Sequence, residues 1–234
     1  MNGTKNWALY SAGNFALLLV AAVFWTASAS AGTISSVPAP VVGGPGLGTV
    51  AVPAIITVQA NNDNVPDPSK LDNNIFVPVK RFDNPGYIDI EFFVSPSDGV
   101  TEYKVFESVD NNTGVNWSSY RMELGYGLGA AFTKSIAGDD LDFDFPHYDL
   151  SPTSSAMPLV GLPDEDTLVF KGGVHGSGSE SYEFRIDVPD IATSPYFSRF
   201  TLRQIPIPVP EPSTFALFGI ALSGMMVFRS RSSR

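Results

Sequence analysis

The sequence predicts an all-β fold, a single antiparallel β-sandwich of the jelly-roll or immunoglobulin-like kind. Its 234 residues are rich in Phe, Tyr, Val, Gly, Pro, Asn and Asp, a mixture that favours strands and turns. Short segments that alternate polar and apolar residues recur along the chain, and Gly, Pro and Asn separate them. Between the two ends we find no convincing amphipathic helix. These three observations together indicate two packed sheets.

The expected strands follow one another at short and fairly regular spacing, after a first strand at residues 50–58. Alternation is clearest at residues 87–94, where Asp89 and Glu91 alternate with apolar residues such as Ile90. One face of that strand should therefore be exposed to solvent, as a wet face, and the other should be buried. We expect the other strands at residues 75–80, 101–109, 117–127, 130–136, 141–145, 167–171, 181–188 and 197–205.

The first 31 residues have the features of a cleaved export signal. The apolar run at residues 15–25 is about as long as a signal-peptide core and too short to span a bilayer. Ala29 and Ala31 each complete a small-x-small pattern after this run, and we expect cleavage after Ala31. Residues 32–54 carry no charge and should form a Pro/Gly-rich, flexible or extended leader, which leaves residues 55–207 for the sandwich.

Residues 208–234 combine three elements in order. A Pro-Glu-Pro triplet keeps the chain out of a helix. The apolar segment after it is short for a membrane span but sufficient with snorkelling flanks, and the basic tail should stay on the cytoplasmic side. The body should therefore face away from the cytoplasm. The residues are Pro210, Glu211 and Pro212, then the transmembrane segment 214–228, then Arg229, Arg231 and Arg234.

This tripartite tail resembles the PEP-CTERM sorting signal of Gram-negative bacteria. The resemblance implies recognition by exosortase, a membrane-embedded cysteine protease, and processing near the Pro-Glu-Pro triplet. The protein would lie transiently in the inner membrane and then reach the cell envelope, the outer surface or the exterior. Proteins with this signal tend to accompany exopolysaccharide and biofilm systems. The body, at residues 83–127 and 200–204, is also similar to exported choice-of-anchor proteins, which implies a β-rich surface domain without assigned catalytic residues.

The charge balance and the absence of cysteine exclude several classes of function. The formal net charge is -10, and most acids lie in the body, so a nucleic-acid partner is not expected. Without cysteine the chain has no disulfide, no thiol nucleophile and no cysteine metal site. The fold must therefore depend on its hydrophobic core.

Three of the four aspartates in the segment GDDLDFDF suggest a metal site. Asp140, Asp142 and Asp144 would share one face of a strand, with apolar residues on the opposite face. Carboxylates gathered in this way could bind Ca²⁺, which prefers several oxygen ligands. The alternative is an ordinary solvated strand face above the core.

We find no residues with the arrangement of a catalytic site. His147 and His175 are the only histidines, and they lack the spacing of a zinc site. Four strand glutamates leave a polysaccharide hydrolase open, because the separation of two carboxylates cannot be read from sequence. Trp117, Tyr120 and Tyr126 could form a sugar-stacking platform or belong to the core. The glutamates are Glu91, Glu107, Glu123 and Glu183.

We therefore expect an exported, exosortase-processed structural or adhesive protein of the cell surface or extracellular matrix, associated with exopolysaccharide or biofilm, and not an enzyme. A carbohydrate-binding or calcium-binding module is the alternative. A polysaccharide-acting hydrolase is a third hypothesis.

Overall fold

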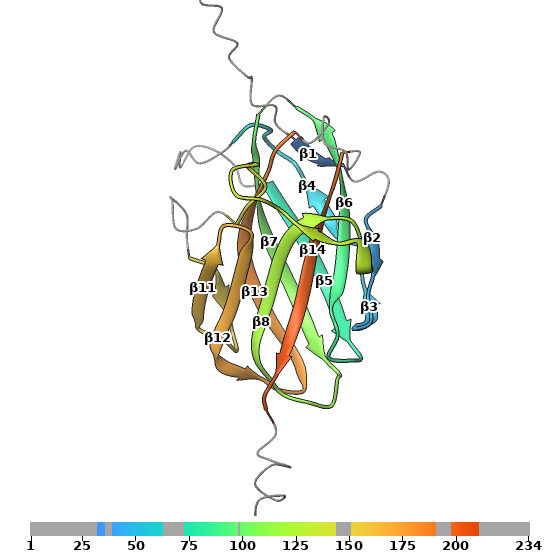
Figure 1. The fold of residues 1–234 in the computed structure, drawn as a ribbon, viewed down its shortest axis with the longest axis vertical. Coiled ribbons are helices and arrows are strands. Elements are labelled where there is room, and N and C mark those ends of the chain that lie inside the picture. The colour runs from blue at the N-terminus through green and yellow to red at the C-terminus, as the bar shows by residue number, and fades with distance from the viewer. Residues whose placement is uncertain are drawn as a thin grey trace, which may run out of the picture.

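The computed structural model describes residues 32–35, 39–62, 73–97, 99–143, 151–190 and 198–210. These residues form two β-sheets that pack face to face (Figure 1). The described part contains no α-helix, and its one helical turn is the 3₁₀ segment η1 (Gly129–Ala131). The predicted all-β sandwich is therefore confirmed.

The first sheet, called here the β8 sheet, has eight strands and only antiparallel pairs. The C-terminal strand β14 lies between β6 and β8, and the short strands β2 and β9 pair with β6 and β8 respectively. The path runs through β1 (Gly32–Ser35), β6 (Ile88–Pro96), β14 (Arg199–Pro208), β8 (Trp117–Tyr126), β12 (Thr167–His175) and β11 (Leu159–Asp164), with β2 (Val41–Gly43) and β9 (Thr133–Lys134) beside it.

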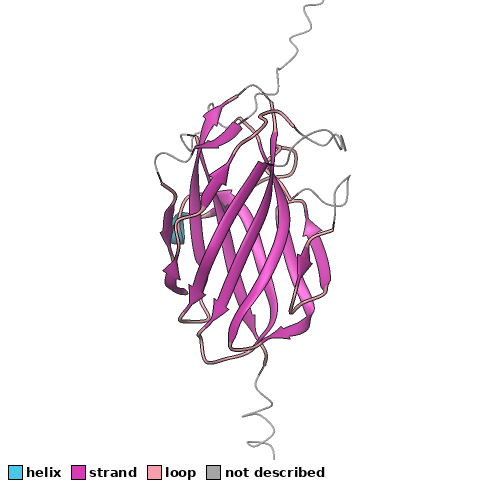
Figure 2. Ribbon diagram, turned by 180° about the vertical axis from the view of Figure 1, so that it is seen from behind, coloured by secondary structure: helices cyan, strands magenta, loops and turns pink. Residues whose placement is uncertain are grey.

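The second sheet, called here the β7 sheet, has six strands and faces the viewer in Figure 2. Its β5–β7 pair is parallel, whereas its other pairs are antiparallel, so the sandwich is mixed at this one place. The path runs through β10 (Thr153–Ser154), β13 (Gly178–Val188), β7 (Thr101–Asn111), β5 (Asn73–Phe82) and β3 (Leu47–Val50), with β4 (Ala54–Ile56) beside β5.

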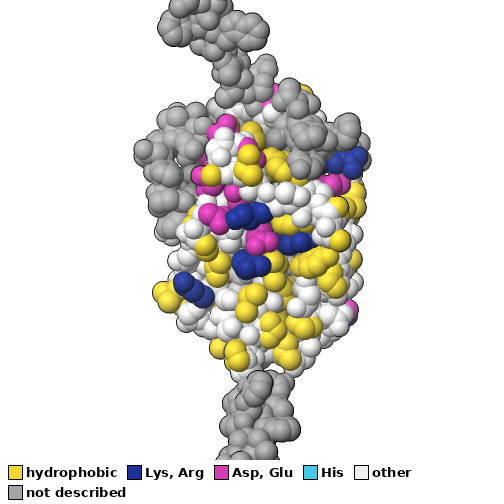
Figure 3. Space-filling view, viewed as in Figure 1, with side chains coloured by type: hydrophobic (Ala, Val, Ile, Leu, Met, Phe, Trp, Pro, Cys, Tyr) yellow, Lys and Arg dark blue, Asp and Glu magenta, His cyan; other side chains and the backbone are white. Residues whose placement is uncertain are grey.

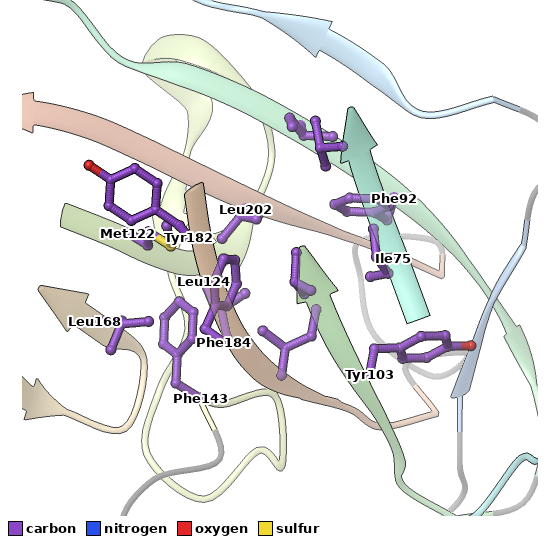
Figure 4. Close-up of a cluster of buried hydrophobic side chains, with 14 of the residues drawn as sticks. Ile75, Phe92, Tyr103, Met122, Leu124, Phe143, Leu168, Tyr182, Phe184 and Leu202 are labelled. Carbon is purple, nitrogen blue, oxygen red and sulfur yellow. The ribbon is translucent and has the colours of Figure 1, made fainter. Parts of the chain in front are cut away.

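The hydrophobic core fills the space between the sheets, as the close-up in Figure 4 shows. Strand alternation supplies it: in β7, Tyr103 and Val105 point inward and are fully buried, while Lys104 between them is only partly buried. Strands from both sheets contribute aromatic rings, and Phe92 of β6 stacks on Phe200 of β14 with centroids 5.2 Å apart. This packing replaces the disulfides that the chain lacks.

The segment expected to be a leader takes part in both sheets. β1 and β2 pair with β6, and β3 pairs with β5. The sequences of β1, β2 and β3 show no alternation of polar and apolar residues. Backbone pairing with the long strands β6 and β5 holds them in the sheets. The described sandwich therefore includes strands that lie before residue 55, and this part of the expected boundary is corrected.

Two other expectations on local structure are corrected. Residues 130–136 form the end of η1 and the two-residue strand β9, and the described part of 141–145 makes only an isolated bridge, Asp142 with Asp187. Strands β10 and β11 were not expected. The predicted signal at 1–31, with Ala29 and Ala31, and the segment 211–234 lie outside the described residues.

Candidate functional site

The chain leaves the sandwich through its central strand. β14 is flanked on both sides, and Pro208 still pairs with Trp117 at the end of the β8 sheet. One residue later, the Val209 amide donates to the carbonyl of Asn116 at 2.8 Å. Pro210 is exposed and is the last described residue. The Pro-Glu-Pro triplet therefore begins where the hydrogen bonds of the sandwich end.

The two ends of the described chain lie at opposite ends of the β8 sheet (Figure 1). Gly32 pairs with Pro96 at one end, near the start of β14, and Pro208 lies at the other. Twelve or so residues of strand separate the two positions, or roughly 40 Å at about 3.3 Å per residue. An attachment at the C-terminal side would therefore present the opposite end of the sandwich outward.

The outer face of the β7 sheet carries a hollow of about 340 Å³. Phe76 and Phe106, which are paired in register across β5 and β7, stack with ring centroids 5.2 Å apart and an interplanar angle of 9°. Phe76 remains 38% exposed. The hydroxyl-bearing residues Ser108, Ser181 and Thr153 also line the hollow.

Small residues create this hollow. Ser108 and Ser181 face each other across β7 and β13, next to the Phe106–Glu183 pair of the same strands. Lys104 forms an ion pair with Glu183 at 2.6 Å, and its ammonium lies 4.7 Å from the Phe106 ring centroid. These two contacts hold the side chains of Glu183 and Phe106, which line the hollow. The hollow thus combines an apolar aromatic surface with hydroxyl and charged groups, the usual composition of a ligand pocket.

A second polar cluster lies in the core and joins the two sheets. Lys80 of β5 donates to Oε2 of Glu107 in β7 and to Oε1 of Gln204 in β14. Gln204 Nε2 in turn donates to Glu107 Oε1 at 3.0 Å and to Oε2 at 2.8 Å. Lys80 and Gln204 are fully buried and Glu107 is 4% exposed.

A β-bulge places Lys80 in this cluster. The register of β5 against β7 shifts between Val77 and Lys80, and Val79 is 47% exposed. Strict alternation from Val77 would instead turn Val79 inward and Lys80 outward. The extra residue therefore reverses the phase of the strand, so Lys80 points into the core.

The surroundings of the cluster are aromatic and buried. The Lys80 ammonium lies 5.6 Å from the centroid of the buried Tyr120 ring. Burial lowers the pKa of Lys80 to about 8, against the opposing effect of the Glu107 carboxylate. Burial and the charge of Glu107 also raise the pKa of Tyr120 well above its ordinary value.

His175 is a core residue. It ends β12 and is fully buried against Trp117, with ring centroids 4.5 Å apart. Its Nε2 donates to the Gly178 carbonyl at 3.0 Å, so Nδ1 accepts from the Tyr182 hydroxyl at 2.9 Å. Burial lowers the pKa of His175, and the neutral ring has a structural role. His147 lies outside the described residues.

The aspartates expected to share a strand face do not form that strand. Asp140 has a positive φ of 61°, and Asp142 makes the single bridge to Asp187. Leu141 and Phe143 are buried, as expected for the core side. Asp144 lies outside the described residues, and within the described ranges no group of three or more acids or histidines is arranged to hold a metal ion. Calcium binding stays a prediction.

The aromatic residues considered for sugar stacking belong to the core. Trp117 and Tyr120 are fully buried and Tyr126 is 7% exposed. The half-exposed pair Phe76 and Phe106 was missed, because one ring in each of two distant segments gives no local signal. Lys80 and Gln204 were missed too, since the sequence does not show the bulge.

The outer face of the β8 sheet is charged over its middle. Figure 3 shows basic and acidic side chains interleaved there, above a region of hydrophobic side chains. Arg203 is central: it bonds to Asp89 at 2.7 and 2.8 Å and lies between the rings of Tyr87 and Phe132. Asp89 is 1% exposed and Glu91 is 7% exposed, so the wet face expected for β6 is buried. The η1 segment and the arginines of β14 cover it.

Comparison with known families identifies the tail. Residues 208–232 match the PEP-CTERM protein-sorting motif. The match starts at the last residue of β14 and covers the triplet, the apolar segment and two of the three arginines. No curated protein and no solved structure matched the chain. The resemblance of the body to choice-of-anchor proteins is not supported by these comparisons.

Proposed function

We propose that this chain, an exported protein that its PEP-CTERM motif targets to exosortase, serves as a structural or adhesive component of the cell surface or extracellular matrix. The observation that supports this role is the junction at Val209 and Pro210. Because hydrogen bonding continues to Val209, an attachment near the triplet would hold the folded body by its central strand. Such a connection suits the display of a rigid body.

Polysaccharide is the partner that the outer face of the β7 sheet fits best. The faces of aromatic rings pack against the C–H groups of sugar rings, and the hydroxyls beside Phe76 and Phe106 can bond to sugar hydroxyls. The net charge of -10 would repel an acidic polysaccharide, so we propose a neutral glycan. Association with exopolysaccharide would follow from this contact.

Glycan binding can be tested with the purified protein on an array of neutral and acidic polysaccharides, with and without EDTA. Phe76→Ala should weaken binding about fivefold, for the loss of ~1 kcal/mol of stacking. Val174→Ala, which removes a 53% exposed side chain from the other sheet, is the matched control and should bind as the parent does. No binding to any glycan under either condition would refute the adhesive role and leave exosortase targeting untouched.

A calcium-dependent module is the second candidate, and the EDTA arm tests it. Loss of binding in EDTA would favour it over the metal-free contact. For a hydrolase, the corresponding test is turnover of a bound polysaccharide by the parent and by Glu123→Gln. Equal turnover by both would exclude Glu123 as a catalytic group.

A further inference from the structure

The polar cluster between the sheets brings an amine, a carboxamide and a carboxyl group into mutual contact. The Lys80 amine contacts the Gln204 carboxamide oxygen and the Glu107 carboxylate, and the Gln204 amide nitrogen contacts the same carboxylate. The side chains of Lys80 and Glu107 are completely closed off from solvent. These are the groups that acyl transfer from a carboxamide to an amine requires.

We propose that Lys80 and Gln204 are joined by an intramolecular isopeptide bond, with Glu107 as the catalytic residue that transfers protons. The bond would connect β5 of the β7 sheet to β14 of the β8 sheet through the core. Neither the sorting motif nor glycan binding depends on it.

The reaction is balanced without a cofactor. The Lys80 ammonium gives one proton to Glu107, and the neutral amine then attacks Cδ of Gln204. Glu107 passes its proton to Nε2 of Gln204 and takes the second proton from the attacking nitrogen. The bond from Cδ to Nε2 breaks, and ammonia leaves. The products are a secondary amide between the two side chains, a protonated Glu107 and one ammonia.

Geometry and environment both favour this reaction. Groups held in contact and well oriented can reach effective concentrations of about 10⁵–10⁸ M. A buried ion pair is costly to desolvate, whereas the products carry no charge, so the reaction removes the charge pair from the core. Burial lowers the pKa of Lys80 to about 8, which increases the fraction of amine in the nucleophilic form.

The fold holds each reactant on a strand. The bulge between Val77 and Lys80 turns the lysine inward, and the parallel β5–β7 pairing sets Glu107 opposite Val77. Gln204 comes from the opposite sheet, where β14 is fixed by neighbours on both sides. Because β14 ends at Pro208, two residues before Pro210, the bond would tie the strand that leads to the attachment point to the far sheet. It would supply the covalent connection that a cysteine-free chain cannot obtain from disulfides.

Intact-mass measurement of the purified, folded protein tests the proposal directly. We expect a mass lower than that of the polypeptide by one ammonia. After trypsin digestion we expect no cleavage at Lys80, because its amine is acylated, and a branched peptide that joins Lys80 to Gln204. The full polypeptide mass in folded parent protein would overturn the proposal, and so would an ammonia loss that maps to other residues.

Variants identify the groups that react. Lys80→Met and Gln204→Met should each restore the full mass, whereas Lys104→Met, which removes a lysine from the outer face of the same sheet, should keep the ammonia loss. Glu107→Leu should give full-mass protein as well. Retention of the ammonia loss in Lys80→Met or Gln204→Met would exclude the bond. If these variants fail to fold, the mass and the branched peptide of the parent protein still decide whether the bond is present.

Discussion

Replacing Arg203 by Met should cost far more stability than replacing a comparable exposed arginine. Arg203 makes two hydrogen bonds to Asp89, donates to the Gly129 carbonyl at 2.7 Å and lies between two aromatic rings. Asp89 is only 1% exposed, so the substitution leaves a buried carboxylate without its cation. Loss of one partner from a buried pair costs about 3–5 kcal/mol. Arg81→Met should cost little, because the Arg81 side chain is 42% exposed and water screens its pairing with Asp83.

Equilibrium unfolding in urea and thermal melting of the two variants would measure the difference. For a domain of this size the Arg203→Met loss corresponds to a drop in Tm of roughly 6–20 °C. Adding Asp89→Asn to Arg203→Met should recover part of the loss, because the lone charge is then absent. Equal destabilisation by Arg203→Met and Arg81→Met would refute the assignment of a buried ion pair between Arg203 and Asp89.

Three further predictions concern stability. Burial raises the pKa of Asp166 to about 7, and the charges of Asp139 and Glu165 add to this effect. The folded state therefore keeps a proton on Asp166 that the unfolded state loses above about pH 4. Stability should therefore fall as the pH rises from about 4 to 7, and Asp166→Asn should flatten this slope in urea titrations at each pH; an unchanged slope would contradict it. Gly173→Ala should lower Tm clearly, because a Cβ there would lie 1.9 Å from the Ala156 carbonyl oxygen, whereas Gly43→Ala meets nothing within 4 Å and should be near neutral. Phe200→Ala should cost about 3–5 kcal/mol in urea unfolding by leaving a cavity beside Phe92, and a loss below about 1 kcal/mol would argue against the packed core.

Most of the strands could be predicted because alternation and turn residues are local signals. Strands β5 to β8 and β12 to β14 all overlap an expected segment. Strands β1 to β3 could not be predicted, since they are held by pairing with β5 and β6 and show no pattern of their own. The parallel pairing of β5 with β7 is likewise a property of the assembled sheet.

Two buried charged side chains, one outside and one inside the sandwich, show where local patterns fail. Asp89 was expected to be exposed to solvent because it is polar. Arg203, from a strand more than a hundred residues away in the sequence, covers it instead. Lys80 was expected at the end of a short strand, and only the bulge sends it inward to Glu107 and Gln204. The sorting motif, in contrast, lies in consecutive residues, and the match at residues 208–232 confirms its prediction from the sequence.

We propose that exosortase, to which the PEP-CTERM motif targets the chain, releases this sandwich at the end of its central strand. The most direct test is mass spectrometry of the protein recovered from cells and from medium, in strains with and without exosortase. We expect mature protein that starts near Gly32 and ends close to Pro210-Glu211-Pro212 when the enzyme is present, and a retained tail when it is absent. An intact C-terminus through Arg234 in all mature protein of the strain that has exosortase would contradict the claim.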